Sequence, residues 1–139
     1  MPDFILHPQL AADTVAVGDL PLCRVTLSTD ANYPWLILVP RRPDIVELID
    51  LAAADRAALM AEIDAAARAL KATVPCDKLN VAALGNMVPQ LHVHIIARRR
   101  TDPAWPKPVW GAVPAKAYGP AARDGLVTAL QRALDIKKT

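Results

Sequence analysis

The stretch that decides the fold is Gln90-Leu91-His92-Val93-His94-Ile95-Ile96, in which apolar residues fall at every second position. This is the period of a β-strand, because successive side chains on a strand point to opposite faces of a sheet. We therefore expect a strand over residues 90–97, with Gln90, His92 and His94 in a row on one face and the aliphatic residues in the core. The segment 85–89 before it is rich in turn-forming residues, which let the backbone come close to a ligand.

Length and composition predict one domain with an aliphatic core. The chain has 139 residues, of which 53% are hydrophobic, with one Phe and two Tyr, and this length suits a single domain. The net charge of +2 is too small to indicate nucleic-acid binding, and the sequence has no basic stripe interleaved with aromatic residues. A slight positive charge is compatible with a phosphorylated small molecule.

The cysteines and the N-terminus indicate the compartment. Cys23 and Cys76 are far apart and form no metal-binding or redox motif, which is typical of a reduced intracellular protein. The N-terminus lacks the charged and apolar regions of a signal peptide, and no apolar run reaches membrane-spanning length. We expect a cytoplasmic protein without a membrane partner.

Periodicity along the rest of the chain predicts the other elements. The continuous apolar run 35–39, ended by a proline, is typical of a central strand buried on both faces. Apolar residues at helical spacing predict a long, alanine-rich helix. In order we expect a lead-in over 1–12, strands over 14–17, 22–27, 35–39, 79–84 and 90–97, helices over 53–73 and 121–136, and an ordered irregular segment over 101–120. This order predicts an α+β fold with an antiparallel sheet.

Two histidines on one strand face can serve as metal ligands, as acid–base catalysts or as a nucleophile. A structural zinc site is the weakest interpretation, because no nearby Asp, Glu or Cys has a recognisable ligand spacing. Attack on phosphorus fits better, since one imidazole nitrogen can attack while the other donates the hydrogen bond that fixes the tautomer. His94, the Gln90 amide, Asn86 and backbone N–H groups could then surround the phosphoryl oxygens. The spacing alone leaves equally open a polar strand face without a catalytic role.

The heptapeptide QLHVHII resembles the signature of the histidine triad (HIT) superfamily of nucleotide hydrolases and transferases. That signature has three histidines at alternate positions, separated by hydrophobic residues and followed by two more. WLILVPRR resembles the family's central strand, the following elements come in the family's order, and Trp105 to Gly111 resembles a Trp-Pro element of some members. The resemblance implies a HIT-like fold with a long central helix and a C-terminal helix. Residues 1–139 would form a single domain, with a core over about 13–100 and a C-terminal extension over 101–139.

The resemblance also implies roles for individual residues. His92 matches the middle histidine and would attack the α-phosphate of a nucleotide, forming a covalent nucleotidyl-histidine that water resolves. His94 matches the last histidine and would contact the phosphate. Asp30 resembles the acid that holds the ribose hydroxyls, although a turn aspartate explains it equally well. Asn86 falls where the family places a polar residue that binds the phosphate.

Two departures from the family pattern bear on activity. Gln90 stands at the position of the first histidine, where it can donate and accept hydrogen bonds but cannot become cationic. Met87 stands where some members carry a serine that protonates a leaving amine, and a thioether cannot donate a proton. Phosphoramidate cleavage is therefore in doubt, whereas an acidic leaving group needs less help.

The sequence supports two functional hypotheses. The first is a hydrolase or transferase that cleaves a purine nucleotide ester or a dinucleoside polyphosphate at the α-phosphate. It would need no cofactor of its own, and a divalent cation would enter only with a polyphosphate substrate. The second is a nucleotide-binding or sensing module with little or no turnover, because of Gln90 and Met87. The family also implies a homodimer formed by the helix and a strand edge.

Basic and aromatic side chains close to the histidines are further candidates. Arginines at strand ends are commonly only solvated, but Arg98 would share the face of the histidines if the strand continues, so we expect it to bind phosphate. Trp105 and Trp110 either close over the site or anchor the C-terminal segment, and we favour anchoring.

Overall fold

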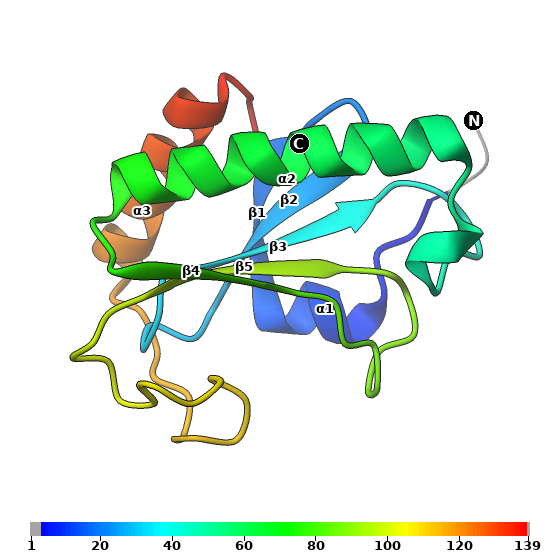
Figure 1. Cartoon of the computed structure of the whole chain (residues 1–139). Coiled ribbons are helices and arrows are strands. Elements are labelled where there is room, and N and C mark those ends of the chain that lie inside the picture. Colours follow the sequence, from blue (N-terminus) through cyan, green and yellow to red (C-terminus); the bar gives the residue numbers. More distant parts are fainter. Residues whose placement is uncertain (1–3, 139) are drawn as a thin grey trace.

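The structure is a computed structural model and describes residues 4–138 (Figure 1). It has an α+β fold with one sheet, a long helix and a C-terminal helix, so the predicted fold class is confirmed. In chain order the elements are α1 (Pro8–Asp13), β1 (Thr14–Asp19), β2 (Cys23–Ser28), β3 (Trp35–Pro40), the 3-10 helix η1 (Leu48–Asp50), α2 (Ala53–Thr73), β4 (Lys78–Ala82), β5 (Val93–Arg98) and α3 (Pro120–Leu134).

The five strands form one sheet in the order β1-β2-β3-β5-β4, and each neighbouring pair is antiparallel. β3 lies in the middle because its continuous apolar run can be buried on both sides. Leu36 and Leu38 pack in the main core, while Ile37 and Val39 pack in a second cluster with Leu10 of α1. The predicted strand with two buried faces is thus confirmed.

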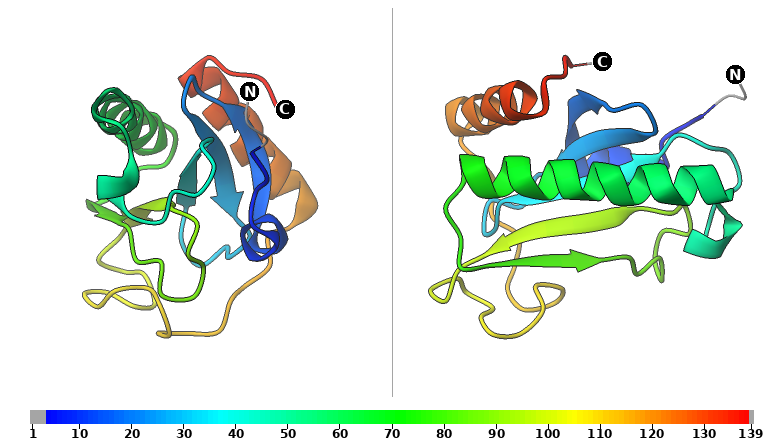
Figure 2. Two further views of the ribbon diagram at one scale, coloured as in Figure 1. Left: turned by 90° about the vertical axis from the view of Figure 1, so that its right-hand side faces the viewer. Right: turned by 45° about the horizontal axis from the view of Figure 1, so that its top comes forward.

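The long helix α2 has the predicted bounds, and its apolar stripe packs on the sheet. Its residues Leu59, Ala66 and Leu70 share the main core with Val127 and Leu130 of α3. Figures 1 and 2 show α3 beside the C-terminal half of α2. Two helices therefore cover the core side of the sheet and leave the other side to α1 and the loops.

The strand that carries the histidines is shorter than expected. We predicted a strand over 90–97, but β5 begins at Val93, because the Leu91 N–H donates to the Ile45 carbonyl outside the sheet at 2.9 Å. His94 is paired with Ile37 on one side and with Ala82 on the other, which places it in the interior of the sheet. His92 lies in the connection just before the strand.

The N-terminal lead-in also differs from the expectation, because it contains the short helix α1. The His7 Nδ1 accepts the Gln9 N–H at 3.0 Å, and Pro8 occupies the first turn, where its missing N–H costs nothing. The first three residues of the expected lead-in lie outside the described part of the chain. Within residues 4–138, none of the helices is long and apolar enough to cross a membrane.

Candidate active site

His92 is held in the tautomer that suits a nucleophile. Its side chain is buried, and its Nδ1 lies 2.8 Å from the Gln90 backbone carbonyl oxygen. A carbonyl oxygen only accepts hydrogen bonds, so this partner assigns the ring proton to Nδ1 and leaves a lone pair on Nε2. A neutral imidazole with a free lone pair is the form that attacks phosphorus.

His94 is held in the opposite tautomer. Its Nδ1 accepts the indole N–H of Trp35 at 3.0 Å, and because an indole only donates, the His94 proton lies on Nε2. Burial and, second, the neighbouring His92 lower the pKa of His94 from 6.5 to about 4, so it is neutral at pH 7. The two rings are 4.8 Å apart and nearly perpendicular. The pair thus presents a lone pair and an N–H donor.

The two tryptophans of the C-terminal segment have different places. The ring of Trp110 lies edge-on to His94 at 5.0 Å and to Trp35 at 5.8 Å, and it is 39% exposed. Trp105 instead packs against the guanidinium of Arg98 at 5.6 Å. The expected anchoring role fits Trp105, whereas Trp110 lies against the site.

Arg98 belongs to a buried ion pair, which is at odds with our expectation of a phosphate ligand. It is 1% exposed and donates to both Asp102 oxygens at 2.8 and 3.1 Å and to Asn80 Oδ1 at 2.8 Å. Burial alone would raise the pKa of Asp102, but the hydrogen bonds from Arg98 and from three backbone N–H groups lower it overall. Arg98 therefore ties the segment after β5 to the sheet, and its donors are engaged within the protein.

Gln90 enters the site through its backbone rather than its side chain. Its Oε1 accepts the His7 N–H at 2.8 Å, and its Nε2 donates to the Ile5 carbonyl at 2.9 Å. The side-chain amide therefore holds the N-terminal segment, while the backbone carbonyl orients His92. The sequence placed the amide beside the phosphate, and the structure places it on the N-terminal segment.

Asp30 and Asn86 lie in loops and have no direct hydrogen bond to the histidines. Asp30 Oδ1 accepts the N–H of Asn32 at 3.0 Å, its side-chain amide at 2.8 Å and the N–H of Lys116 at 3.2 Å. Oδ2 of Asp30 has no partner within residues 4–138, so it can accept from a ligand. Asn86 is exposed on the loop before the histidines, and its side chain has no hydrogen bond to any residue in the described range.

Sequence reasoning missed Trp35, which we assigned only to a buried strand. It sets the tautomer of His94 and packs edge-on against Trp110. The available signal was an indole at the first position of an otherwise aliphatic strand, where a polar N–H needs a partner. Across residues 4–138, no group of three or more His, Cys, Asp or Glu side chains could hold a metal ion.

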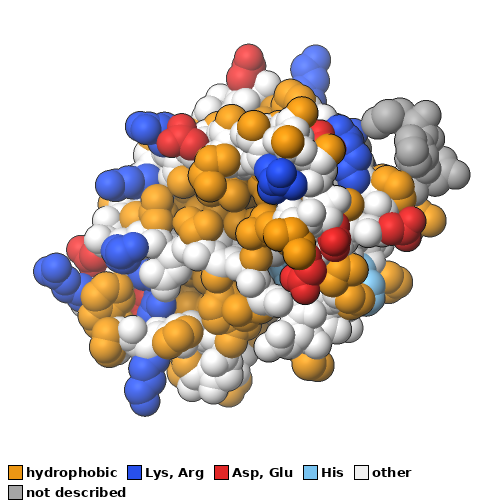
Figure 3. All heavy atoms as spheres, turned by 45° about the vertical axis from the view of Figure 1, so that its right-hand side comes forward, with side chains coloured by type: hydrophobic (Ala, Val, Ile, Leu, Met, Phe, Trp, Pro, Cys, Tyr) orange, Lys and Arg blue, Asp and Glu red, His pale blue; other side chains and the backbone are white. Residues whose placement is uncertain are grey.

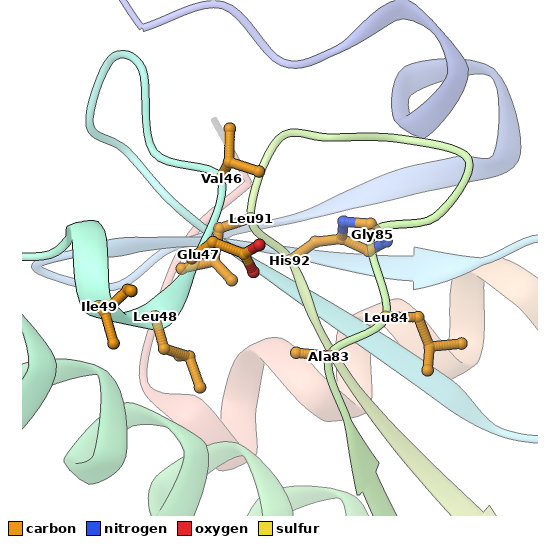
Figure 4. Close-up of a pocket in the computed structure, with 9 residues that line it drawn as sticks. All are labelled: Val46, Glu47, Leu48, Ile49, Ala83, Leu84, Gly85, Leu91 and His92. Carbon is orange, nitrogen blue, oxygen red and sulfur yellow. The ribbon is translucent and has the colours of Figure 1, made fainter.

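A pocket of about 290 Å³ lies beside His92 (Figure 4). We call it the His92 pocket. One wall is the segment 46–49, and the opposite wall is the segment 83–85. Leu91 and His92 complete the lining. The sequence left residues 44–50 without an assigned element, so it did not predict this pocket.

Comparisons with known proteins show that this chain is similar to histidine triad proteins. A family model described as HIT domain matches residues 9–101. A histidine triad protein of Bradyrhizobium japonicum has 56% identity and a TM-score of 0.94, and the alignment covers 96% of this chain and 99% of the other. A histidine triad protein of Marinobacter aquaeolei has 45% identity and a TM-score of 0.92, with coverages of 95% and 96%.

More distant structures share the fold alone. A hypothetical histidine triad nucleotide-binding protein of Sulfolobus tokodaii has 17% identity and a TM-score of 0.66, with coverages of 88% and 84%. A comparison with curated proteins gives no match.

Proposed function

The chain belongs to the HIT domain family, whose members generally bind nucleotides and often hydrolyse or transfer them, and on this premise we propose that it cleaves a nucleoside phosphate ester at the α-phosphate. The observation that carries the proposal is the pair of opposite tautomers. His92 receives its tautomer from the Gln90 carbonyl and His94 from the Trp35 indole. One ring therefore offers the electron pair for attack, and the other offers a hydrogen bond to a phosphoryl oxygen.

The proposed reaction has two steps. The Nε2 lone pair of His92 attacks the α-phosphorus, an N–P bond forms, and the bond to the leaving group breaks with its electron pair on the leaving atom. Water then attacks phosphorus, the N–P bond breaks, and the lone pair returns to Nε2. Overall one water is consumed, its oxygen ends on phosphorus, and one of its protons ends on the leaving group. The His94 N–H stabilises the charge on the phosphoryl oxygens throughout.

We propose a purine nucleotide ester or a dinucleoside polyphosphate as the substrate class. Asp30 Oδ2 would accept from the ribose hydroxyls, and Asn86 would donate to the phosphate from its exposed loop. The covalent step is assigned to His92 without a resident cofactor, and a divalent cation would accompany only a polyphosphate substrate. Gln90 would act as a positioning residue, because its carbonyl sets the tautomer of His92.

We also propose a cytoplasmic homodimer in which the chain works as one domain. β4 is an edge strand with unpaired backbone groups, and such edges commonly pair with another chain. The groove between β4 and α2 is apolar, and it includes Met60 and Val81, which are 66% and 51% exposed. Figure 3 shows hydrophobic side chains spread across the middle of this face.

The direct test is intact-protein mass spectrometry after brief mixing with an adenylate ester. Wild type should gain the mass of one adenylate, and His92→Ala should not. Asp124→Asn, an exposed substitution on α3, serves as the control and should form the adduct normally. The absence of both adduct and released AMP across several nucleotide esters would refute the proposal.

A second candidate function is a nucleotide-binding module with negligible turnover. Two observations favour it: the Met87 thioether is 93% exposed and supplies no proton, and the Gln90 amide is engaged with the N-terminal segment. This function predicts that a mononucleotide raises the melting temperature although no ester is cleaved.

A further inference from the structure

The His92 pocket has apolar walls and one acidic side chain. Four hydrophobic side chains of its lining are unusually exposed, at 45% to 83% of their surface: Val46, Leu48, Leu84 and Ile49. Exposed apolar side chains gathered around a hollow are typical of a binding surface. Glu47 lies among them, and Figure 4 shows its carboxylate pointing across the pocket toward His92.

The charge of Glu47 is available to a ligand. The salt bridges formed among residues 4–138 do not include Glu47. The Glu47 carboxylate accepts the backbone N–H of Asp50, and the carboxylate of Asp50 accepts the N–H groups of Val46 and Glu47 at 3.2 and 2.8 Å. This reciprocal pair holds the turn that forms the wall. The pocket therefore has a fixed wall that carries one negative charge.

The aromatic groups near His92 do not line this pocket. His94 contacts Trp35 and Trp110, and Trp110 belongs to the same irregular segment that donates a backbone N–H to Asp30. An aromatic surface and a carboxylate suit the base and the ribose of the nucleoside. Because His92 lines the pocket, a phosphorus atom bound at its Nε2 would have two substituents in different places. The nucleoside would lie toward Trp110, and the leaving group would lie in the pocket.

From this arrangement we propose that the His92 pocket is the leaving-group subsite, and that Glu47 makes it select an apolar leaving group that carries a positive charge over an anionic polyphosphate. This inference rests on the proposed function, because it concerns the second substituent of the same phosphorus. The volume of about 290 Å³ accommodates a single aromatic ring with a short substituent. A polyphosphate chain would meet four aliphatic side chains, which donate no hydrogen bonds, and a like charge, which repels it.

The chemistry of the step is unchanged by this assignment. For an aryl ester, His92 Nε2 forms the N–P bond as the P–O bond breaks, and the electron pair remains on the phenolate oxygen in the pocket. A water proton completes the phenol after hydrolysis of the N–P bond. Glu47 is a specificity residue that contacts the leaving group and takes no proton in either step.

The test uses adenosine 5′-phosphate aryl esters that differ in the charge of one para substituent. Each kcat/KM is divided by the rate of uncatalysed hydrolysis of the same ester, which removes the difference in leaving-group reactivity. The esters carry a 4-aminomethyl, a 4-methyl or a 4-carboxy group, and diadenosine tetraphosphate is added as the polyphosphate. In wild type kcat/KM should be highest for the cationic ester, lower for the neutral ester and lowest for the anionic ester. Each unit of charge should change kcat/KM about threefold, which is the size expected for an ion pair with an exposed carboxylate. Glu47→Gln should flatten this order, and Glu47→Lys should reverse it.

Two controls distinguish an effect of the Glu47 charge from misfolding of the variants and from a change in the overall electrostatic field of the protein. Asp124→Asn removes the same charge on α3 and should keep the wild-type order. Urea unfolding of wild type and of both Glu47 variants should give similar midpoints, because residue 47 is exposed, and this shows that the variants are folded.

The outcomes distinguish this inference from the proposed function. If the esters are cleaved in a His92-dependent manner but the order does not change in either Glu47 variant, the subsite assignment is wrong and the function stands. The same holds if diadenosine tetraphosphate is the best substrate of wild type. If no ester is cleaved and no adduct forms, the proposed function and this inference fall together.

Discussion

Acidification should destabilise the folded protein through His94. Burial and His92 lower the pKa of His94 from 6.5 to about 4 in the folded state. At pH values between these two pKa values, His94 binds a proton in the unfolded chain but not in the folded protein. The free energy of unfolding therefore decreases as the pH falls. The loss begins near pH 6.5 and is complete below about pH 4.

The magnitude follows from the difference in pKa. A shift from 6.5 to about 4 corresponds to a total loss of about 3 kcal/mol, of which about 2 kcal/mol is lost between pH 7 and pH 5. Other groups also titrate in this range, so the measurement must isolate His94. The His94→Asn variant does this, because Asn cannot titrate and its side-chain oxygen can accept the Trp35 N–H in place of Nδ1.

The assay is urea unfolding of both proteins at pH 7, 6 and 5. The difference in unfolding free energy between wild type and His94→Asn should change by about 2 kcal/mol across this range, with wild type losing more. If both proteins lose stability in parallel, the folded protein accepts the proton on His94 as readily as the unfolded chain does. That result would refute the neutral, N–H-donating His94 on which the proposed mechanism depends.

Three further substitutions test separate contacts. Trp35→Phe removes the donor to His94, and we expect kcat to fall about fivefold to tenfold with KM nearly unchanged, which steady-state kinetics on a nucleotide ester would show. Gln90→Glu replaces the donor to the Ile5 carbonyl with an acceptor, so hydrogen exchange of residues 5–7 should accelerate while β5 stays protected. Glu62→Gln disturbs a buried carboxylate that accepts two backbone N–H groups at the start of β2, both at 2.8 Å, and urea unfolding should show a loss of about 2 kcal/mol.

The parts of the fold that depend on local periodicity could be predicted from the sequence. The bounds of α2 follow from apolar residues at helical spacing, ended where Val74 precedes a proline. The burial of β3 on both faces follows from its unbroken apolar run. The apolar alternation over residues 90–96 correctly predicted that Leu91, Val93 and Ile95 lie in the main core. In each case one stretch of chain contains all the information.

The parts that depend on a choice of distant partner could not be predicted. The Leu91 N–H donates to the Ile45 carbonyl, which is far away in the sequence, and this contact keeps Leu91 and His92 out of β5. The charge of Arg98 could pair with a phosphate or with an acidic side chain equally well. Only the folded chain shows that Arg98 forms its salt bridge with Asp102. Trp35 had the same ambiguity, because an indole in a strand gives no sign of which acceptor it will meet.

For the proposed activity, the variant residue Gln90 matters less than its position in the family signature implies. His92 obtains its tautomer from the carbonyl of residue 90, and every amino acid supplies that carbonyl. His94 obtains its tautomer from an indole outside the signature. Neither contact requires an imidazole at position 90, so its loss removes a titratable group but leaves the lone pair and the N–H donor in place. The glutamine amide adds a separate contact, because it joins the N-terminal segment to the backbone that orients His92, the proposed nucleophile.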